Sequence, residues 1–232
     1  MAVSNPAGRT IAGVAFDLDD TLFAQAEWLD GAWSAVAAAA PAGLSSPAFE
    51  AALREIASEG SARGRIIDRA LESVGRSDLD VAPLIAVFRS HAPRRLEPFV
   101  GVADALDALA ARVPLGLISD GDPLIQRAKL RALGLDHMFA APVWSDELGR
   151  RHRKPDPAPF RVALSRMGVE AAEAVYVGDR PDKDVAGAVG VGMRAIRVRT
   201  GEYTAAADLP DTWATVADVV DAIELVIGLI EV

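Results

Sequence analysis

The chain begins with an apolar run and then changes to helical spacing. The segment Ile11–Phe16 is long enough for a buried strand and too short for a helix. From Ala24 to His91 the apolar positions recur at helical spacing, with no strand pattern between them. The expected helices are Ala24–Ala40, Ser46–Glu59, Ala62–Val74 and Val81–His91. Four consecutive helices predict a small helical module inserted after the first strand.

From Pro98 onward, helix and strand patterns alternate. The expected strands are Pro114–Ile118, Phe139–Trp144, Ala174–Val177 and Met193–Val198. The expected helices are Val102–Arg112, Pro123–Leu133, Asp156–Met167, Asp184–Val189 and the terminal stretch Val219–Val232. This alternation is typical of an α/β fold, a parallel sheet with helices on both faces. We therefore expect a discontinuous sheet domain of residues 1–22 and 98–232, with the helical module at 23–97.

Composition and charge narrow the class of partner. The formal net charge is −9, and no basic run is long enough to bind nucleic acid or an anionic membrane. The chain has no cysteine, which excludes thiolate catalysis and cysteine-ligated zinc. Its first residues lack the pattern of a secretory signal, and its longest apolar stretch is too short to span a bilayer. We expect a cytoplasmic protein.

Two carboxylates directly follow the first expected strand. Asp17 and Asp19 are separated by one residue, so they would project similarly from an extended backbone and could share a pocket. The carboxyl ends of parallel strands are where open α/β sheets build their ligand sites. Paired carboxylates repel each other unless a cation lies between them. The pattern favours a divalent-metal site, although acids after an apolar run also occur as helix caps.

Three further polar clusters fall at expected strand ends or helix starts. Ser119-Asp120-Gly121 could hold phosphate oxygens through a hydroxyl and backbone N–H groups, or could cap a helix. Lys154 could neutralise a phosphate, although a lysine before proline is often only solvated. Asp179 at a strand tip and Asp184 entering a helix would suit an oxygen-ligated cation such as Mg²⁺.

In order and spacing, these four clusters resemble the four motifs of the haloacid dehalogenase superfamily. The residues that carry the resemblance are Asp17-Leu18-Asp19-Asp20-Thr21, Ser119, Lys154, and Gly178-Asp179 with Asp184. The resemblance covers nearly the whole expected sheet domain. It implies a Rossmann-like sheet of five strands in the order 5-4-1-2-3. The inserted helices resemble the mobile helical cap of that superfamily.

The resemblance also implies a phosphatase mechanism. Asp17 would attack phosphorus and form an aspartyl-phosphate, and Asp19 would act as general acid and then as general base. Ser119, the adjacent amide near Gly121, and Lys154 would stabilise the transferred phosphoryl group. Mg²⁺ would be held by Asp17, the backbone carbonyl of Asp19, Asp179 and Asp184.

Two acids of the motifs receive no catalytic role from the resemblance. Asp20 is interpreted as structural. Asp120 falls within the expected substrate-binding turn, at a position where many members of the superfamily carry asparagine. Because another carboxylate beside a phosphate would repel it, we expect Asp120 to face a protein group.

Several alternatives within the superfamily differ at identifiable residues. Dehalogenases lack an acid at the position of Asp19, and phosphonatases use a cap lysine, whereas the only lysines here are Lys129, Lys154 and Lys183. A sugar phosphomutase and a non-catalytic phosphate-binding relative remain alternatives. The expected partner is a small phosphorylated metabolite, and the chain is expected to be a monomer or homodimer.

The leaving-group side of the substrate is the least defined part of the site. The candidates to line it are Phe23, Arg63 and Arg65, with Trp28, Trp33 and Arg69 as further possibilities. The alternative interpretation is a core position for the aromatic residues and a solvated surface for the arginines.

Overall fold

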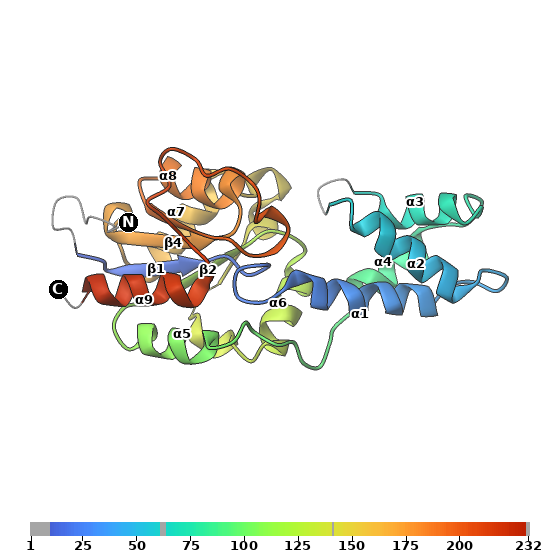
Figure 1. Cartoon of the computed structure of the whole chain (residues 1–232), viewed down its shortest axis with the longest axis horizontal. Coiled ribbons are helices and arrows are strands. Elements are labelled where there is room, and N and C mark those ends of the chain that lie inside the picture. The colour runs from blue at the N-terminus through green and yellow to red at the C-terminus, as the bar shows by residue number, and fades with distance from the viewer. Residues whose placement is uncertain (1–9, 61–63, 141, 231–232) are drawn as a thin grey trace. The chain divides into compact units, whose positions relative to one another are not determined.

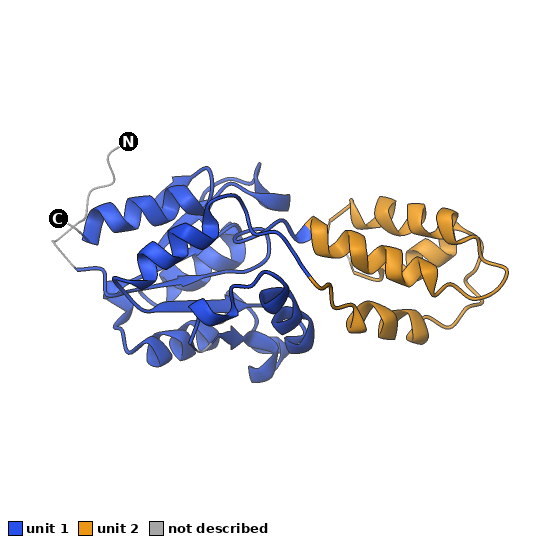
Figure 2. Cartoon of the chain, turned by 90° about the horizontal axis from the view of Figure 1, so that it is seen from below, with its two compact units in different colours: residues 1–25, 95–232 blue, residues 26–94 orange. Residues whose placement is uncertain are grey.

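The computed structural model describes residues 10–60, 64–140 and 142–230. The chain divides into two compact units, of which residues 1–25 and 95–232 form the first and residues 26–94 the second (Figure 2). We call them the sheet unit and the helical unit. The units divide at residues 25/26 and 94/95, and the boundaries expected from the sequence were 22/23 and 97/98. Phe23 and Pro98 form a bridge inside the sheet unit, so the helical unit begins after Phe23 and ends before Pro98.

The sheet unit is built on a parallel six-stranded sheet in the order β3-β2-β1-β4-β5-β6. The strands are β1 (Gly13–Phe16), β2 (Leu115–Ser119), β3 (Val143–Trp144), β4 (Ala174–Gly178), β5 (Arg194–Val198) and β6 (Ala214–Val216). The first five strands have the expected order. The expected number of five is wrong, because β6 adds an edge strand beside β5. With only three residues and little apolar periodicity, β6 has no sequence pattern of its own.

Helices cover both faces of the sheet. They are α5 (Val102–Ala110), α6 (Pro123–Ala132), α7 (Pro157–Met167), α8 (Ala186–Gly190) and α9 (Val219–Ile230). Figure 1 shows α7 and α8 on one face and α5 and α9 on the other. The helix expected from Asp184 begins later, because Pro181–Val185 form a wider π-helical turn before α8. No described helix is both long and apolar enough to cross a membrane.

The centre of the sheet is buried because its strands are apolar on both faces. Every residue of β1, β2 and β4 is buried, which fits their continuous apolar sequences. Phe160 of α7 packs edge-to-face on Tyr176 of β4, with 5.1 Å between ring centroids. Phe16 of β1 is register-paired with Leu117 and with Val177. The central strands therefore end together at one edge of the sheet.

The helical unit contains α1 (Gln25–Ala38), α2 (Ser46–Ala57), α3 (Ile66–Ser73) and α4 (Ala82–Ser90), with α1 starting at the boundary residue. Its core includes Trp33, which stacks on Phe88 with 4.7 Å between ring centroids. Trp28 is also buried and meets Phe88 edge-to-face. Both tryptophans are therefore core residues of the helical unit, the alternative that the sequence had left open.

The segment between β5 and β6 is fastened by a buried arginine. Arg197 of β5 is fully buried, and its guanidinium donates to the carbonyl oxygens of Ala206 (2.7 Å) and Tyr203 (2.6 Å). It also donates to Asp208 Oδ1 at 2.5 Å. Removal of this group would leave two carbonyl oxygens without this donor, while Asp208 would keep its contact with Arg199.

We expect Arg197→Met to lower the free energy of unfolding by about 2 kcal/mol, because two carbonyl oxygens lose hydrogen bonds from a charged donor. The matched control is Arg199→Met, because Arg199 contacts the same Asp208 at 2.8 Å from a side chain that is 40% exposed. Exposed pairs contribute about 1 kcal/mol or less. Thermal and urea unfolding of both variants measures the difference, and equal losses would contradict a special role for Arg197.

Candidate active site

The polar residues of all four sequence clusters meet at the carboxyl edge of the sheet. Asp17 follows β1, Ser119 ends β2, and Asp179 follows β4. Lys154 precedes α7, and Asp184 lies in the turn before α8. The strands are parallel and in register, so their carboxyl ends converge there. The structure therefore brings together residues that are far apart in sequence.

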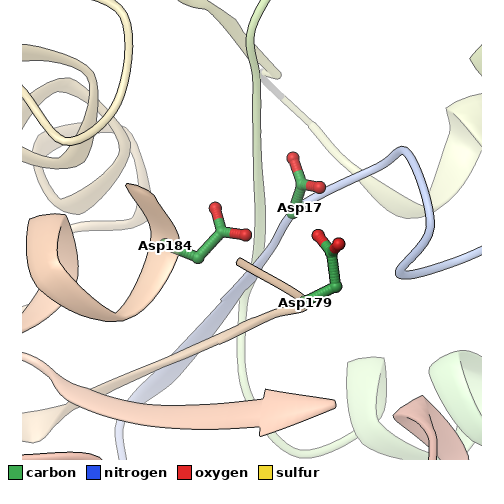
Figure 3. A group of neighbouring side chains, drawn as sticks. All are labelled: Asp17, Asp179 and Asp184. Atoms are coloured by element: carbon green, nitrogen blue, oxygen red, sulfur yellow. The ribbon is translucent and has the colours of Figure 1, made fainter. Parts of the chain in front are cut away.

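Three of these acids form a compact buried cluster. Asp17, Asp179 and Asp184 each offer a carboxylate oxygen within 4.8 Å of the others, and their side chains point toward a common centre (Figure 3). The N–H of Arg180 donates to Asp184 Oδ2 at 3.0 Å, which fixes the orientation of that carboxylate. A Cβ on Gly178 would lie only 2.5 Å from Asp184 Cγ, so this strand end requires glycine.

Lys154 supplies the positive charge of the cluster. Its Nζ lies 2.5 Å from Asp17 Oδ1 and 2.7 Å from Asp184 Oδ1. It also donates to the Tyr176 hydroxyl at 3.2 Å. Burial opposes the charge, but the Asp17 and Asp184 carboxylates hold the pKa of Lys154 well above its usual value. Lys154 is thus a buried cation of the site and not a solvated loop residue.

One ammonium group does not balance three buried carboxylates. Burial, with Asp184, Asp17 and Asp20 adding their charges, raises the pKa of Asp179 to about 9. Burial also raises the pKa of Asp17 to about 7, even though Lys154 opposes the shift. Asp179 accepts no hydrogen bond and forms no ion pair with any residue that the structure describes. An all-oxygen cluster with surplus negative charge fits a hard divalent cation.

Asp19 points to a different set of partners. Lys129 Nζ lies 2.7 Å from Asp19 Oδ1, and Gln126 Nε2 lies 2.7 Å from Asp19 Oδ2. Gln126 Nε2 also lies 2.6 Å from Ser119 Oγ, so it links the two sequence-predicted residues. Asp17 and Asp19 thus each contact a different lysine.

Sequence reasoning missed Gln126 and Lys129 as site residues. Both belong to α6, whose buried face also contains Ile125 and Leu130. Polar side chains at positions that helical periodicity assigns to the buried face would have been the signal.

Asp120 faces protein groups, as expected from its place beside Ser119. Its Oδ1 accepts hydrogen bonds from Ser145 Oγ (2.7 Å) and from the N–H of Lys154 (3.0 Å). Its Oδ2 lies 3.2 Å from Lys183 Nζ. Although burial opposes ionisation, Lys154, Ser145 and Lys183 hold the pKa of Asp120 below its usual value. The carboxylate joins the loops that carry the second, third and fourth motifs. Gly121 beside it has a φ of 119°, which favours glycine.

Asp20 shapes the turn after the first motif. Its φ is 56°, and its Oδ1 accepts from the N–H of Gln25 at 2.9 Å, at the start of α1. Its carbonyl oxygen accepts from the Thr200 hydroxyl, and Gly201 packs against its side chain with no room for a Cβ. These contacts fit the structural interpretation of Asp20.

The leaving-group candidates belong to different parts of the chain. Phe23 is fully buried in the sheet unit, with Lys129 Nζ 6.0 Å from its ring centroid. Arg65 lies in the helical unit, where its side chain is 71% exposed and forms ion pairs with Asp68 and Glu72. Arg63 lies outside the described residues.

Comparison with known proteins assigns the chain to a family. The model of the haloacid dehalogenase-like hydrolases matches residues 11–192. The chain is 36% identical over 202 residues to the glyceraldehyde 3-phosphate phosphatase of Methanopyrus kandleri, covering 83% of this chain and 86% of that protein. It is 35% identical over 199 residues to the phosphoglycolate phosphatase of Rhodospirillum rubrum, covering 81% and 79%.

Solved structures show the same fold. The crystal structure of a 2-haloacid dehalogenase from Pseudomonas syringae pv. Tomato aligns with a TM-score of 0.63 at 31% identity, covering 94% of this chain and 99% of that one. The fold and site define an α/β hydrolase with an acidic centre at the sheet edge. The chain belongs to the haloacid dehalogenase-like hydrolases.

The pKa values of Asp17 and Asp179 predict how stability depends on pH when divalent cations are removed. Both carboxyls have a usual pKa of 3.8, raised in the folded protein to about 7 and about 9. Between the usual and the raised values the folded state binds more protons than the unfolded state, so the free energy of unfolding falls as pH rises. We expect the melting temperature in EDTA to fall between about pH 5 and about pH 9.

Mg²⁺ should raise the melting temperature most at the alkaline end, because a cation binds the deprotonated carboxylates. The Asp179→Asn variant, compared with the wild type, tests this explanation. It should flatten the pH slope in EDTA and remove most of the stabilisation by Mg²⁺. Differential scanning calorimetry of both proteins measures these effects, and parallel pH profiles would contradict the assignment of the slope to this cluster.

Proposed function

We propose that this protein is a magnesium-dependent phosphatase that hydrolyses a small phosphorylated metabolite through an aspartyl-phosphate. The observation that carries the proposal is the convergence of Asp17, Asp179 and Asp184 with Lys154 at the sheet edge. The names of the relatives, glyceraldehyde 3-phosphate phosphatase and phosphoglycolate phosphatase, support a short phosphorylated carbon chain as the substrate class.

In the proposed mechanism Asp17 is the nucleophile. Lys154 contacts its carboxylate, and the backbone N–H of Asp17 donates to the carbonyl oxygen of Val177 at 2.9 Å, which holds the backbone at this position. Attack on phosphorus forms the acyl-phosphate bond and breaks the bond to the leaving oxygen, which splits one displacement into two. Because desolvation raises the pKa of Asp17 to about 7, a nearby cation favours the ionised form that attacks.

The remaining residues handle charge and protons. Asp19 would protonate the leaving oxygen and later accept the proton of the attacking water. Ser119 and Lys154 would bind phosphoryl oxygens as charge develops. Asp17, Asp179, Asp184 and the backbone carbonyl of Asp19 would hold Mg²⁺, which when bound neutralises the carboxylates and polarises the phosphoryl group.

We propose that the helical unit selects among leaving groups, the role that the family resemblance implies for its cap. Arg65 stays a candidate for this role because its side chain is largely exposed. A sugar phosphomutase would use the same core residues, and release of inorganic phosphate instead of an isomeric sugar phosphate distinguishes the two activities.

We expect phosphate release from small phosphomonoesters to require Mg²⁺ and Asp17. Asp17→Asn should abolish turnover, because an amide cannot form the acyl-phosphate. Steady-state phosphate release with Mg²⁺ and with EDTA measures both requirements, across a panel that includes glyceraldehyde 3-phosphate and phosphoglycolate. An EDTA-treated enzyme that retains full activity would contradict the metal requirement, and an active Asp17→Asn protein would contradict the nucleophile.

For Asp19 the expected effect depends on the leaving group. Asp19→Asn should slow formation of the aspartyl-phosphate from alkyl phosphates by about a hundredfold or more, because an alkoxide needs a proton to leave. Formation from an aryl phosphate should be affected much less. Rapid-quench measurement of the first half-reaction with both substrates tests this, and equal losses would mean that Asp19 acts only as a structural group.

A further inference from the structure

The carboxylate of Asp19 is held at both oxygens by one helix. Lys129 and Gln126 of α6 contact Oδ1 and Oδ2 separately, each at 2.7 Å. Both donors are only 2% exposed, whereas the Asp19 side chain is 17% exposed. The carboxylate therefore lies at the border of the site, while the groups that contact it are inside the protein.

Two polar side chains lie on the buried face of α6, and the unfavourable free energy of their burial must be offset. Burial of an amide or an ammonium is unfavourable unless each group has hydrogen-bond partners. Gln126 and Lys129 are three positions apart, so they lie on the same side of α6. That helix is fixed by Asp122, whose carboxylate accepts from the N–H of Leu124 at 3.0 Å. α6 thus presents two donors from a defined position.

We propose that Lys129 and Gln126 are positioning residues that orient the Asp19 carboxylate for hydrolysis of the aspartyl-phosphate, an inference that rests on the proposed function above. In this half-reaction the water oxygen bonds to phosphorus, and the bond from phosphorus to the Asp17 carboxylate oxygen breaks. The electron pair returns to Asp17, and the water proton passes to Asp19. Both oxygens of Asp19 are acceptors in this arrangement, as this step requires.

The physical basis is the loss of rotational freedom. A carboxylate held at one oxygen can still rotate and carry its other oxygen away from the water. Donors on both oxygens fix the plane of the group, which is the geometric condition for efficient proton transfer. Gln126 also contacts Ser119 Oγ, so this orientation is linked to the proposed phosphoryl-binding turn.

The test separates the two half-reactions with an aryl phosphate, whose leaving group needs no proton. Lys129→Met and Gln126→Met should leave the rate of aspartyl-phosphate formation nearly unchanged and slow its hydrolysis about tenfold. The phosphorylated enzyme should therefore accumulate during steady-state turnover, and kcat and KM should fall together. Acid quench followed by mass spectrometry measures the phosphorylated fraction.

The matched control is Arg127→Met on the same helix. Arg127 is 43% exposed and pairs with Glu147, so both half-reactions should be unchanged. Lys129→Arg keeps a cationic donor and should recover part of the hydrolysis rate. In an Asp19→Asn background, Lys129→Met should add no further slowing, because the group that it orients is gone. If Lys129 had only a structural role, Lys129→Met would slow the reaction in both the wild-type and the Asp19→Asn protein.

The outcomes separate this inference from the proposed function. A wild-type enzyme that never forms a phosphorylated intermediate overturns the proposed function. A wild-type enzyme that forms it, with Lys129→Met and Gln126→Met behaving like Arg127→Met, overturns only the positioning role. Equal slowing of both half-reactions also overturns it. If Lys129→Met fails to fold, the comparison of Gln126→Met with Arg127→Met decides.

Discussion

The contact of Lys154 with Asp17 and Asp184 is the interaction on which the rest of the site depends. Each of the three side chains is buried, and each would be strongly disfavoured as a lone charge in the interior. Together they are stable because one ammonium lies between two carboxylates and also donates to Tyr176. The remaining carboxylate, Asp179, has no such partner among the described residues. The fold thus retains surplus negative charge that a divalent cation can neutralise.

The sheet makes this charge distribution possible. Parallel strands in register end at one edge, so short loops after β1, β2 and β4 bring their polar residues together. The loops are then tied to one another by Asp120, which contacts Ser145, Lys154 and Lys183. An asparagine could keep the hydrogen bonds but would lose the ion pair with Lys183. The carboxylate at this position therefore stabilises the loops around the site instead of repelling a phosphate.

The sequence predicted those parts of the molecule that local patterns encode. Asp17, Ser119 and Asp179 were recognisable because each lies at the end of a short apolar run, a pattern that favours a buried strand. β6 was missed because pairing with β5, and not its own three residues, makes it a strand. Gln126 and Lys129 were missed because their role depends on contact with Asp19, which is more than a hundred positions away in the chain. Tertiary contacts of this kind leave only a weak trace in one sequence, a polar residue on an otherwise apolar helix face.

Asp17 and Asp19 have different partners, and this difference explains how one short motif can serve two half-reactions. The sequence placed both carboxylates in one pocket, but each contacts its own lysine from a different element. A nucleophile must keep its charge against desolvation, for which Lys154 and a cation provide the compensating charge. A proton-transfer group must keep a fixed orientation and access to water, and Asp19 retains more exposure than Asp17. Separate environments two residues apart allow one turn to provide both properties without a compromise at either carboxylate.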